Sequence, residues 1–531
     1  MKKKEEQSKW YKNKGYPHLT NSYNLTVHDK GLEKKIKDKG FVAKYAFFPL
    51  FHINIKSRRY KAVEVERNGK KEVVKAHSHW KEGNKKSTSK IRPLHYANHL
   101  DAMIFGYYSE MLQENYEKGL KTLPKLDKAV TAYRKIPTLE NPDKHKSNIH
   151  FAKEVFDEIK KRGEKSEVAV LAFDIKSFFS HLNHNKLYDA WCENLGEEKL
   201  PPHHYNVFKA ATNFSFINKD QFRVNPPSKK RRKSGFDEKR LAKIRNKHGV
   251  NAFFESAKAF REAVKRGEIR IYKNPFRVNG KMVGIPQGLP ISATLANIYL
   301  KKFDLDILQR LEENNGFYRR YSDDIIVICE KSEMWEIEEF VLSCIKKYGV
   351  EISVEKTEKF IFRKAELHGK KRFVSHKIEA KKQIINNPLT YLGFEYFGYQ
   401  TLIKSANLSK FYRRMIYAVK SKSRRAKKMA DKRLGAKPVI FKNQLIRLYT
   451  KQDLDDQKAP RKRRFKTLKQ INNGEYRVYS VEKDSYQNSG NYFSYVKRAA
   501  DIMDAPEILD QINSKKARRI FNQALERHLK Q

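Results

Sequence analysis

Three aspartates stand at the ends of apolar runs, and their chemical type suits a metal site. Asp174 ends the run VAVLAFD at 168–174, and Asp323 and Asp324 lead into the β-branched run at 325–328. A carboxylate beside a buried strand loses hydration, and neighbouring negative charges raise one another's pKa, so such groups pair with cations. Carboxylate oxygens are good ligands for Mg²⁺. If the two strands are neighbours in one sheet, Asp174 and Asp323 meet at a magnesium site, with Mn²⁺ as the alternative ion.

Such a site would favour phosphoryl transfer. Two magnesium ions about 3.5 to 4 Å apart stabilise the attacking and leaving oxygens of an in-line displacement. At a tight hairpin turn we expect Asp323 to project over the sheet as the better ligand, with Asp324 supporting it. Taken alone, the SDD sequence also suits a plain acidic turn, so the surrounding elements must decide.

The elements that would position these acids follow from hydrophobic periodicity. The run at 168–174 predicts a buried strand, and FYRRYSDDIIVIC at 317–329 predicts a β-hairpin. Helical spacing of apolar residues predicts helices within 99–112 and 152–159, and again from Leu408 to Val419, where cations occupy the outer faces. This mixture of helices and strands predicts an α+β fold with an antiparallel sheet.

Charge is the dominant feature of the composition. The 531 residues include 113 Lys and Arg against 61 Asp and Glu, a net charge of +52. An excess of this size favours a polyanionic partner, and nucleic acid is the expected one. Three cysteines without a CxxC pair give no disulfide framework or thiolate zinc site, and no apolar run is long enough to span a membrane. We therefore expect a cytoplasmic protein.

Five ordered motifs resemble the palm motifs of reverse transcriptases. They are FDIKSFF at 173–179, GIPQGLPISATLANIYL at 284–300, YSDD at 321–324, EKT at 355–357 and YLGF at 391–394. Any one of them is weak evidence, and their shared order makes the resemblance specific. It implies a right-hand polymerase fold, in which fingers and palm precede a helical thumb and C-terminal region.

The resemblance also implies residue roles. Asp174, Asp323 and Asp324 would be the catalytic acids, and the backbone carbonyl of Ile175 would complete the coordination of the metal. Lys356 would protonate pyrophosphate. The substrate-binding set comprises Arg134 on the triphosphate, Phe179 as the gate against a 2′ hydroxyl with Phe178 as its rival, and Gln287 and Gly288 along the nucleotide and template.

The charged helix that follows YLGF resembles a thumb that tracks nucleic acid through its phosphates. Its candidate contacts are Lys410, Arg413, Arg414, Arg424 and Arg425. The expected domains are a basic N-terminal extension at 1–90, fingers at 91–165, a palm at 166–400 and a helical thumb and basic C-terminal region at 401–531. The palm would carry a basic insertion at about 201–280 that reads as a polar loop.

Four further segments resemble bacterial defence-associated and abortive-infection reverse transcriptases: 14–20, 91–108, 148–156 and 490–500. This group implies antiphage function, homo-oligomers, dNTP substrates, a noncoding RNA template, a DNA product and, as one alternative, priming from a protein hydroxyl. A group II intron or retron-type reverse transcriptase is a rival interpretation. A non-catalytic RNA-binding scaffold is another, and retention of all three aspartates argues against it.

Overall fold

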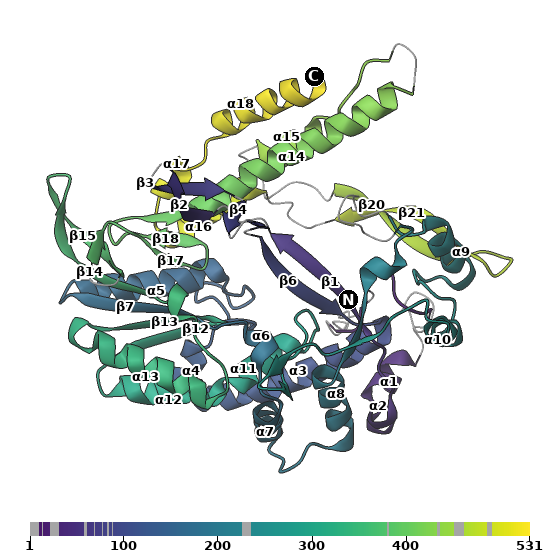
Figure 1. Ribbon diagram of the computed structural model, residues 1–531, viewed down its shortest axis with the longest axis horizontal. Helices are drawn as coiled ribbons and strands as arrows, with labels where there is room; N and C mark the ends of the chain where they lie inside the picture. The colour runs from purple at the N-terminus through teal and green to yellow at the C-terminus, as the bar shows by residue number, and fades with distance from the viewer. Residues whose placement is uncertain are drawn as a thin grey trace.

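The structure is a computed structural model of the chain (Figure 1). It describes residues 10–12, 14–21, 31–57, 61–67, 70–76, 78–81, 84–87, 89–225, 235–379, 382–432, 436–450, 461–485 and 491–530. Within these ranges only the backbone is described at 61–87, 461–466, 483–485 and 530. The cationic loop predicted around KKRRK at 229–233 lies outside the described residues.

A six-stranded sheet forms the centre of the molecule, in the order β12-β13-β7-β14-β15-β16 with antiparallel neighbours. The strands are β7 (Val168–Asp174), β12 (Phe317–Tyr321), β13 (Asp324–Glu330), β14 (Glu358–Leu367), β15 (Lys370–Glu379) and β16 (Lys382–Ile385). The predicted strand and hairpin are therefore neighbours in one sheet. The structure confirms the α+β class and the antiparallel sheet.

Both faces of this sheet are buried, which explains the continuous apolar run of β7. Alternate residues of β7 enter different hydrophobic cores, because side chains alternate along a strand. Leu171 and Phe173 pack in one core and Val168 and Val170 in the other. The first core is covered by α3 (His99–Lys121), α11 (Ser292–Tyr299), α12 (Lys301–Glu312) and α13 (Met334–Lys347), and the second by α5 (Asn148–Gly163) and α16 (Tyr492–Met503).

A second sheet stands beside the first, in the order β6-β1-β8-β9. Its strands are β1 (Leu50–Ser57), β6 (Lys90–Tyr96), β8 (Ser215–Asn218) and β9 (Tyr272–Lys273). The predicted N-terminal extension thus supplies β1, and the predicted loop-like insertion supplies β8 and β9. The prediction of a loop at 201–280 is wrong, because its described part also forms α8 (Pro202–Thr212), α9 (Glu238–His248) and α10 (Ala257–Lys265) around a core of its own.

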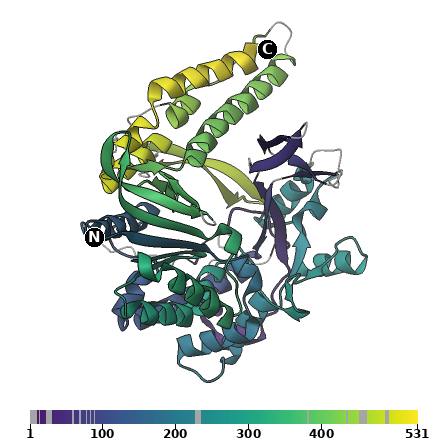
Figure 2. The same ribbon diagram turned by 60° about the vertical axis from the view of Figure 1, so that its left-hand side comes forward.

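The C-terminal part rises above both sheets (Figures 1 and 2). It begins with the small sheet β17 (Leu389–Tyr391), β18 (Phe394–Tyr396) and β19 (Thr401–Ile403), and continues with the long helix α14 (Ser405–Ala430) and α15 (Asn443–Tyr449). It ends with α16, α17 (Glu507–Asp510) and α18 (Ser514–Leu525). Besides these helices, β20 (Arg461–Gln470) and β21 (Tyr476–Ser485) form a hairpin between α15 and α16 that the sequence did not predict.

The remaining elements are short. They are α1 (Leu32–Lys37), α2 (Lys39–Lys44), α4 (Pro124–Ala129), α6 (Phe178–His181), α7 (His184–Leu195), and the hairpins β2 (Lys61–Arg67) with β3 (Lys70–Ala76), β4 (Ser78–Lys81) with β5 (Asn84–Ser87) and β10 (Arg277–Val278) with β11 (Lys281–Met282). Among the described helices, none combines the length and the apolar character that a membrane span requires.

Candidate active site

The candidate acids meet at one end of the six-stranded sheet. Asp324, the first residue of β13, pairs directly with Asp174, the last residue of β7. Asp323 lies in the two-residue turn of the β12–β13 hairpin, after Ser322 with its φ of 61°. The Ile175 amide donates a hydrogen bond of 3.0 Å to the Asp323 carbonyl, which ties the turn to the end of β7. Three carboxylates from two distant segments therefore converge.

The register differs from the expected arrangement in one respect. Directly paired residues of antiparallel strands share a face of the sheet, so Asp324 is the residue that stands opposite Asp174. Asp323 approaches the pair from the turn. That Asp323 is the better ligand, with Asp324 supporting it, stays a prediction.

The electrostatics of the acids reflect their crowding. Loss of hydration and the charges of Asp323 and Asp174 raise the pKa of Asp324 to about 7, against the opposing charges of Lys404 and Lys356. Burial, and to a smaller extent the charge of Asp174, also raises the pKa of Asp323. A group of acids with raised pKa values is one that a cation stabilises.

Lysines from three separate elements surround these acids. Lys356 forms an ion pair with Asp174. Lys404, just before α14, acts on Asp324, and Lys90, the first residue of β6, lowers the pKa of Asp323. An open cavity of about 740 Å³ is lined by Asp174, Lys356 and Lys404 together with residues of β14 and β15. Asp174 thus borders this cavity with two lysines, and Asp324 lines a second cavity of about 230 Å³ that Lys404 also borders.

The donor set fits hard divalent cations, because all three acids offer carboxylate oxygens. In the part of the chain that the structure describes, no three His, Cys, Asp or Glu side chains already gather closely enough to hold a metal ion. The Lys356 ammonium instead pairs with Asp174. The raised pKa values of Asp323 and Asp324 agree with acids whose charge a bound cation would offset.

A buried ion pair holds the hairpin that carries the acids. Arg320 of β12 binds both carboxylate oxygens of Asp304 in α12 at 2.7 and 2.6 Å, and both side chains are fully buried. The Tyr318 hydroxyl donates to the same carboxylate at 2.6 Å. Arg320 also donates to the Ser322 carbonyl at 3.3 Å. The turn before Asp323 is therefore fixed from inside the protein.

Tyr133 supports the same turn from the surface. Its hydroxyl shares a hydrogen bond of 2.9 Å with the Ser322 hydroxyl, and its ring is half exposed. The backbone at Tyr133 has a φ of 65°, a conformation that costs energy in a residue with a side chain. The Thr131 amide donates to the Arg320 carbonyl and anchors the segment on β12. The sequence analysis did not single out Tyr133.

The GIPQGLP loop connects the acids to the second sheet. The His95 amide of β6 donates to the Gln287 carbonyl at 2.9 Å. Gly288 has a φ of 113°, and a Cβ there would lie 2.6 Å from the His95 carbonyl oxygen. Only glycine permits this approach, as the sequence predicts for a backbone that comes close to another. Gln287 and Gly288 therefore lie against β6 of the second sheet.

Phe179 and its rival Phe178 are distinguished by burial. Phe178 lies in the first core and is 3% exposed, whereas Phe179 is only partly buried. The Phe179 carbonyl accepts a hydrogen bond from the Ile285 amide, which holds α6 against the GIPQGLP loop. Phe179 is the more available ring of the two. The Ile175 side chain is buried, and its amide is tied to the Asp323 turn.

Arg134 is placed differently from its expected role. Its side chain is 4% exposed and binds Glu117 at 2.7 Å and Asp127 at 2.5 Å. Its guanidinium also donates to the carbonyls of Asp127 and Val130. All three guanidinium nitrogens have hydrogen-bond partners. Arg134 therefore links α3 to α4 here, and its guanidinium is not free to bind a triphosphate. A short sequence motif could not reveal these acidic partners.

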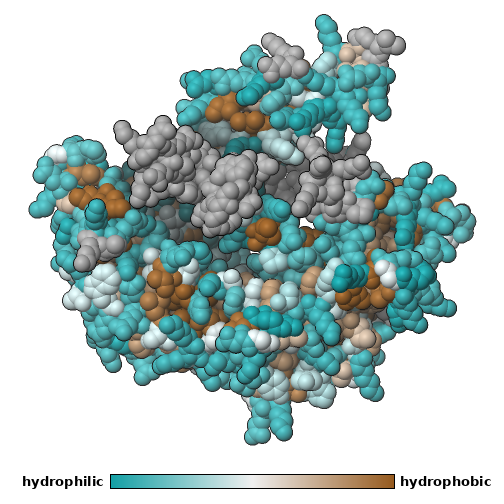
Figure 3. All heavy atoms as spheres, viewed as in Figure 1, coloured by the Kyte–Doolittle hydropathy of each residue, from teal (hydrophilic) through white to brown (hydrophobic). Residues whose placement is uncertain are grey.

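The five predicted nucleic-acid contacts all lie on α14 and are exposed to solvent. The opposite side of the helix is apolar, with Phe411, Met415 and Val419 buried. The KSKSRRAKK run continues this helix to Ala430, so it is ordered secondary structure. Hydrophilic side chains also dominate the visible face of the molecule, where apolar ones gather only in small patches (Figure 3).

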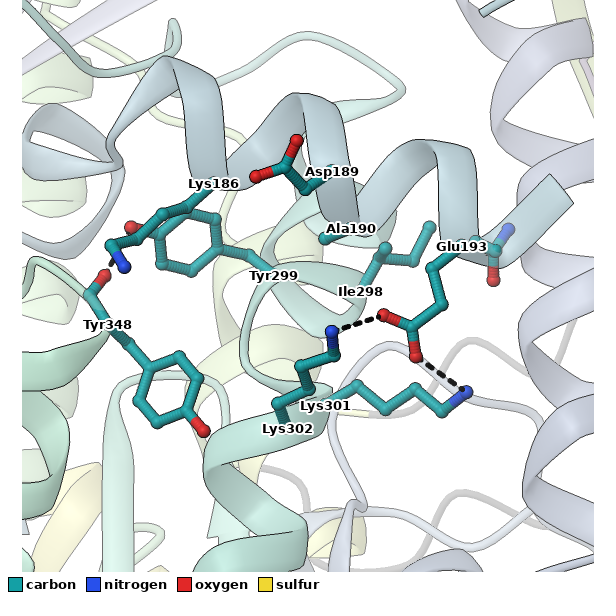
Figure 4. Close-up of a pocket in the computed structure, with 10 residues that line it drawn as sticks. Lys186, Asp189, Ala190, Glu193, Ile298, Tyr299, Lys301, Lys302 and Tyr348 are labelled. Atoms are coloured by element: carbon teal, nitrogen blue, oxygen red, sulfur yellow. Dashed lines mark hydrogen bonds and ion pairs between the residues drawn. The ribbon is translucent and has the colours of Figure 1, made fainter. Parts of the chain in front are cut away.

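A separate cavity of about 150 Å³ lies between α7 and the α11–α12 junction. Figure 4 shows Glu193 between Lys301 and Lys302, at 4.0 and 3.0 Å, so the charges of this pocket largely neutralise each other. None of the predicted site residues lines it. Lys90 and Lys404 also act on the acids, and no motif in the sequence marks either of them.

Comparisons with known proteins agree with this geometry. Residues 233–396 match the family described as reverse transcriptase (RNA-dependent DNA polymerase), a range that contains Asp323, Asp324, Gln287, Gly288 and Lys356. No curated protein matches the chain. Asp174 precedes the matched range and is joined to it by its pairing with Asp324.

Among solved structures, the chain is similar to telomerases of two yeasts. One from Candida albicans, solved with a TWJ fragment of telomeric RNA, shows 12% identity and a TM-score of 0.33 over 66% of this chain and 47% of that one. Apo telomerase from Candida tropicalis shows 13% identity and a TM-score of 0.34 over 64% of this chain and 50% of that one. The chain thus spans about half the length of these telomerases. The family match alone shows that residues 233–396 of the chain contain a reverse transcriptase domain.

Proposed function

We propose that the protein copies RNA into DNA by adding dNTPs to a 3′ end through two-metal-ion phosphoryl transfer. The observation that carries this proposal is the pairing of Asp174 with Asp324, which brings Asp174 to the two aspartates of the matched range. Their carboxylates are the residues that would hold Mg²⁺, or Mn²⁺ in its place. Bound there, the ions would activate the attacking hydroxyl and offset the charge that develops on the leaving pyrophosphate.

The lysines around the acids suit the anionic part of the substrate. Lys90, Lys356 and Lys404 come from three elements, so a triphosphate that reached the acids would meet positive charge from several sides. Binding would draw the Lys356 ammonium from Asp174 toward phosphate oxygens and place it to donate a proton to pyrophosphate. These three lysines would bind the triphosphate, which is the role that the resemblance implies for Arg134.

Substrate selection and template alignment would fall to neighbouring groups. Phe179 would exclude a 2′ hydroxyl by its bulk, and the backbone of Gln287 and Gly288 would lie along the nucleotide and template. The exposed cations of α14, namely Lys410, Arg413, Arg414, Arg424 and Arg425, would hold the phosphates of the product duplex without reading its sequence.

We further propose that the enzyme acts in bacterial antiphage defence as a cytoplasmic homo-oligomer that copies a companion noncoding RNA. This setting rests on the sequence segments that resemble the defence-associated group. Priming from a protein hydroxyl is an alternative to a nucleic-acid primer, and nucleotide-modified tyrosine in a peptide map after reaction would support it. An intron or retron-type enzyme would instead be accompanied by a structured RNA with splice sites or a branching guanosine.

Incorporation of labelled dNTP on a primed RNA tests the activity. We expect Asp323→Asn and Asp174→Asn each to lower the rate at least about 100-fold, because each removes a charged ligand. Asp510→Asn, an exposed acid on α17, is the matched control and should retain activity. Loss of function with retained folding and RNA binding would exclude the scaffold alternative. Full incorporation by Asp323→Asn would contradict the proposed function.

A further inference from the structure

The β20–β21 hairpin leaves the C-terminal helices and returns to them at one point. The Asn491 side-chain amide, just before α16, donates a hydrogen bond of 2.9 Å to the Arg447 carbonyl in α15. The segment between these two residues therefore begins and ends on the same part of the molecule. Its described portion is the hairpin itself.

The hairpin extends from the C-terminal helices toward the second sheet. Figure 1 shows β20 and β21 below α14 and beside α9, and the structure places β21 in contact with α9. Because α9 belongs to the segment that joins β8 to β9, the hairpin connects the C-terminal helices to the part of the protein that carries the second sheet.

The register of the hairpin separates its residues into two faces of different charge. Directly opposed residues share a face, and successive pairs alternate. We call one the cationic face: it carries the pairs Arg461–Ser485, Arg463–Lys483, Phe465–Val481, Thr467–Tyr479 and Lys469–Arg477. We call the other the compensated face: it carries Lys462–Asp484, Arg464–Glu482, Lys466–Ser480, Leu468–Val478 and Gln470–Tyr476.

The two faces differ in whether their cations stand opposite acids. On the compensated face, Lys462 and Arg464 stand opposite acids. On the cationic face, Arg463 stands opposite Lys483 and Lys469 opposite Arg477, and no acid is present. Like charges directly opposite one another destabilise a strand pair. Two such pairs on one face, about 20 Å apart along the strand, suit a ligand with repeated negative charge.

Aromatic residues on the cationic face indicate whether it suits a single-stranded or a double-stranded nucleic acid. Phe465 and Tyr479 lie on the cationic face between its two cation pairs. The described side chains of Lys469, Arg477 and Tyr479 are exposed. Rings between cations suit a single strand, whose unpaired bases stack on aromatic faces while its phosphates meet the cations. A duplex keeps its bases paired and would leave the rings unused.

We propose that the cationic face of the hairpin binds the single-stranded RNA template. This assignment rests on the proposed polymerase function and adds a template-binding surface distinct from α14. The hairpin holds the unpaired strand, and α14 holds the duplex product.

Binding of the full-length protein to a fluorescent single-stranded RNA and to a DNA duplex tests this assignment, without dNTPs so that polymerisation is not required. We expect Lys469→Ser with Arg477→Ser to weaken RNA binding about 10-fold and to reduce the slope of log affinity against log salt by about 1.4. Tyr479→Ser should weaken RNA binding about 5-fold. Duplex binding should change less than 2-fold in each.

The matched control is Lys462→Ser with Lys466→Ser, which removes the same charge from the compensated face. It should change RNA binding less than about 3-fold. Equal losses from both faces, or a loss confined to the duplex, would overturn the inference. If the hairpin variants behave as expected in an enzyme that incorporates no dNTP, the proposed function fails and the RNA-binding face stands.

Discussion

Asp174 and Asp324 face each other across neighbouring strands, and this register makes folding depend on pH. The pKa of Asp324 is raised to about 7, whereas an unfolded chain releases that proton near about 4. Between these values the folded protein binds more protons than the unfolded chain, so the free energy of unfolding falls as pH rises through the window. The stabilisation that Asp324 contributes through its raised pKa is complete below about pH 4 and lost above about pH 7.

Asp324→Asn should therefore stabilise the metal-free protein most at alkaline pH. We expect its melting temperature to exceed that of the wild type by roughly 2 °C near about pH 8, and by less near about pH 5.5. Thermal denaturation in the presence of a chelator measures this. Magnesium should raise the melting temperature of the wild type more than that of the variant. A stabilisation that grows as pH falls would contradict the assignment.

At the residue scale, the sequence could reveal the acids but not all their companions. Asp174, Asp323 and Asp324 adjoin long apolar runs, so they stand out without a structure. Lys90 and Lys404 look like any of the many other cations until the fold brings them near the acids. Arg134 matches a motif but has its side chain engaged elsewhere. Its acidic partners lie on α3 and α4, and no local sequence pattern indicates that they contact it.

At the element scale, the buried Arg320–Asp304 pair should govern the stability of the catalytic hairpin. Asp304→Ala leaves the fully buried Arg320 charge without its carboxylate, a change that costs about 3 to 5 kcal/mol. We expect lower thermal stability together with a lower rate of dNTP incorporation. Thermal denaturation and primer extension measure the two effects.

The exposed pair Arg310–Glu336 on α12 and α13 provides a control for this prediction. The Glu336 side chain is 71% exposed, so Glu336→Ala should cost less than about 1 kcal/mol and leave activity unchanged. Equal costs for Asp304→Ala and Glu336→Ala would show that the buried pair does not support the hairpin.

The packing of the GIPQGLP loop against β6 depends on Gly288. Gly288→Ala would force a Cβ to within 2.6 Å of the His95 carbonyl, in addition to the cost of a positive φ. Gly267→Ala is the matched control, because Gly267 also has a positive φ, of 74°, but open space around it. We expect the control to lose about 1 to 2 kcal/mol of stability. Gly288→Ala should lose more and also raise the KM for dNTP, which steady-state extension measures.

Elements were predictable where periodicity is local and strong. The strand at 168–174 and the hairpin at 317–329 appear at nearly the predicted residues, since both cover buried positions. The helices of the insertion and the β20–β21 hairpin were not predicted for a shared physical reason. Their sequences are rich in cations and carry weak apolar periodicity, yet exposed strands and helices tolerate high charge.

At the scale of the whole molecule, the C-terminal helices complete the core beneath the acids. Phe493, Val496 and Ile508 pack in the same cluster as Val170 of β7 and Ile326 of β13. Glu507 and Gln511 also accept hydrogen bonds from the backbone of β19. The C-terminal segment is therefore part of the structure that supports the site, which its position in the sequence alone does not indicate.

The hairpin, in contrast, should be separable from this core. Because Arg447 and Asn491 already meet, a short Gly-Ser linker in place of residues 451–490 can join them without moving α15 or α16. We expect a melting temperature close to that of the wild type and near-normal addition of a first nucleotide. Products made under single-encounter conditions should be shorter, because the template strand loses one of its contacts. Full-length products from this variant would show that the hairpin does not retain the template.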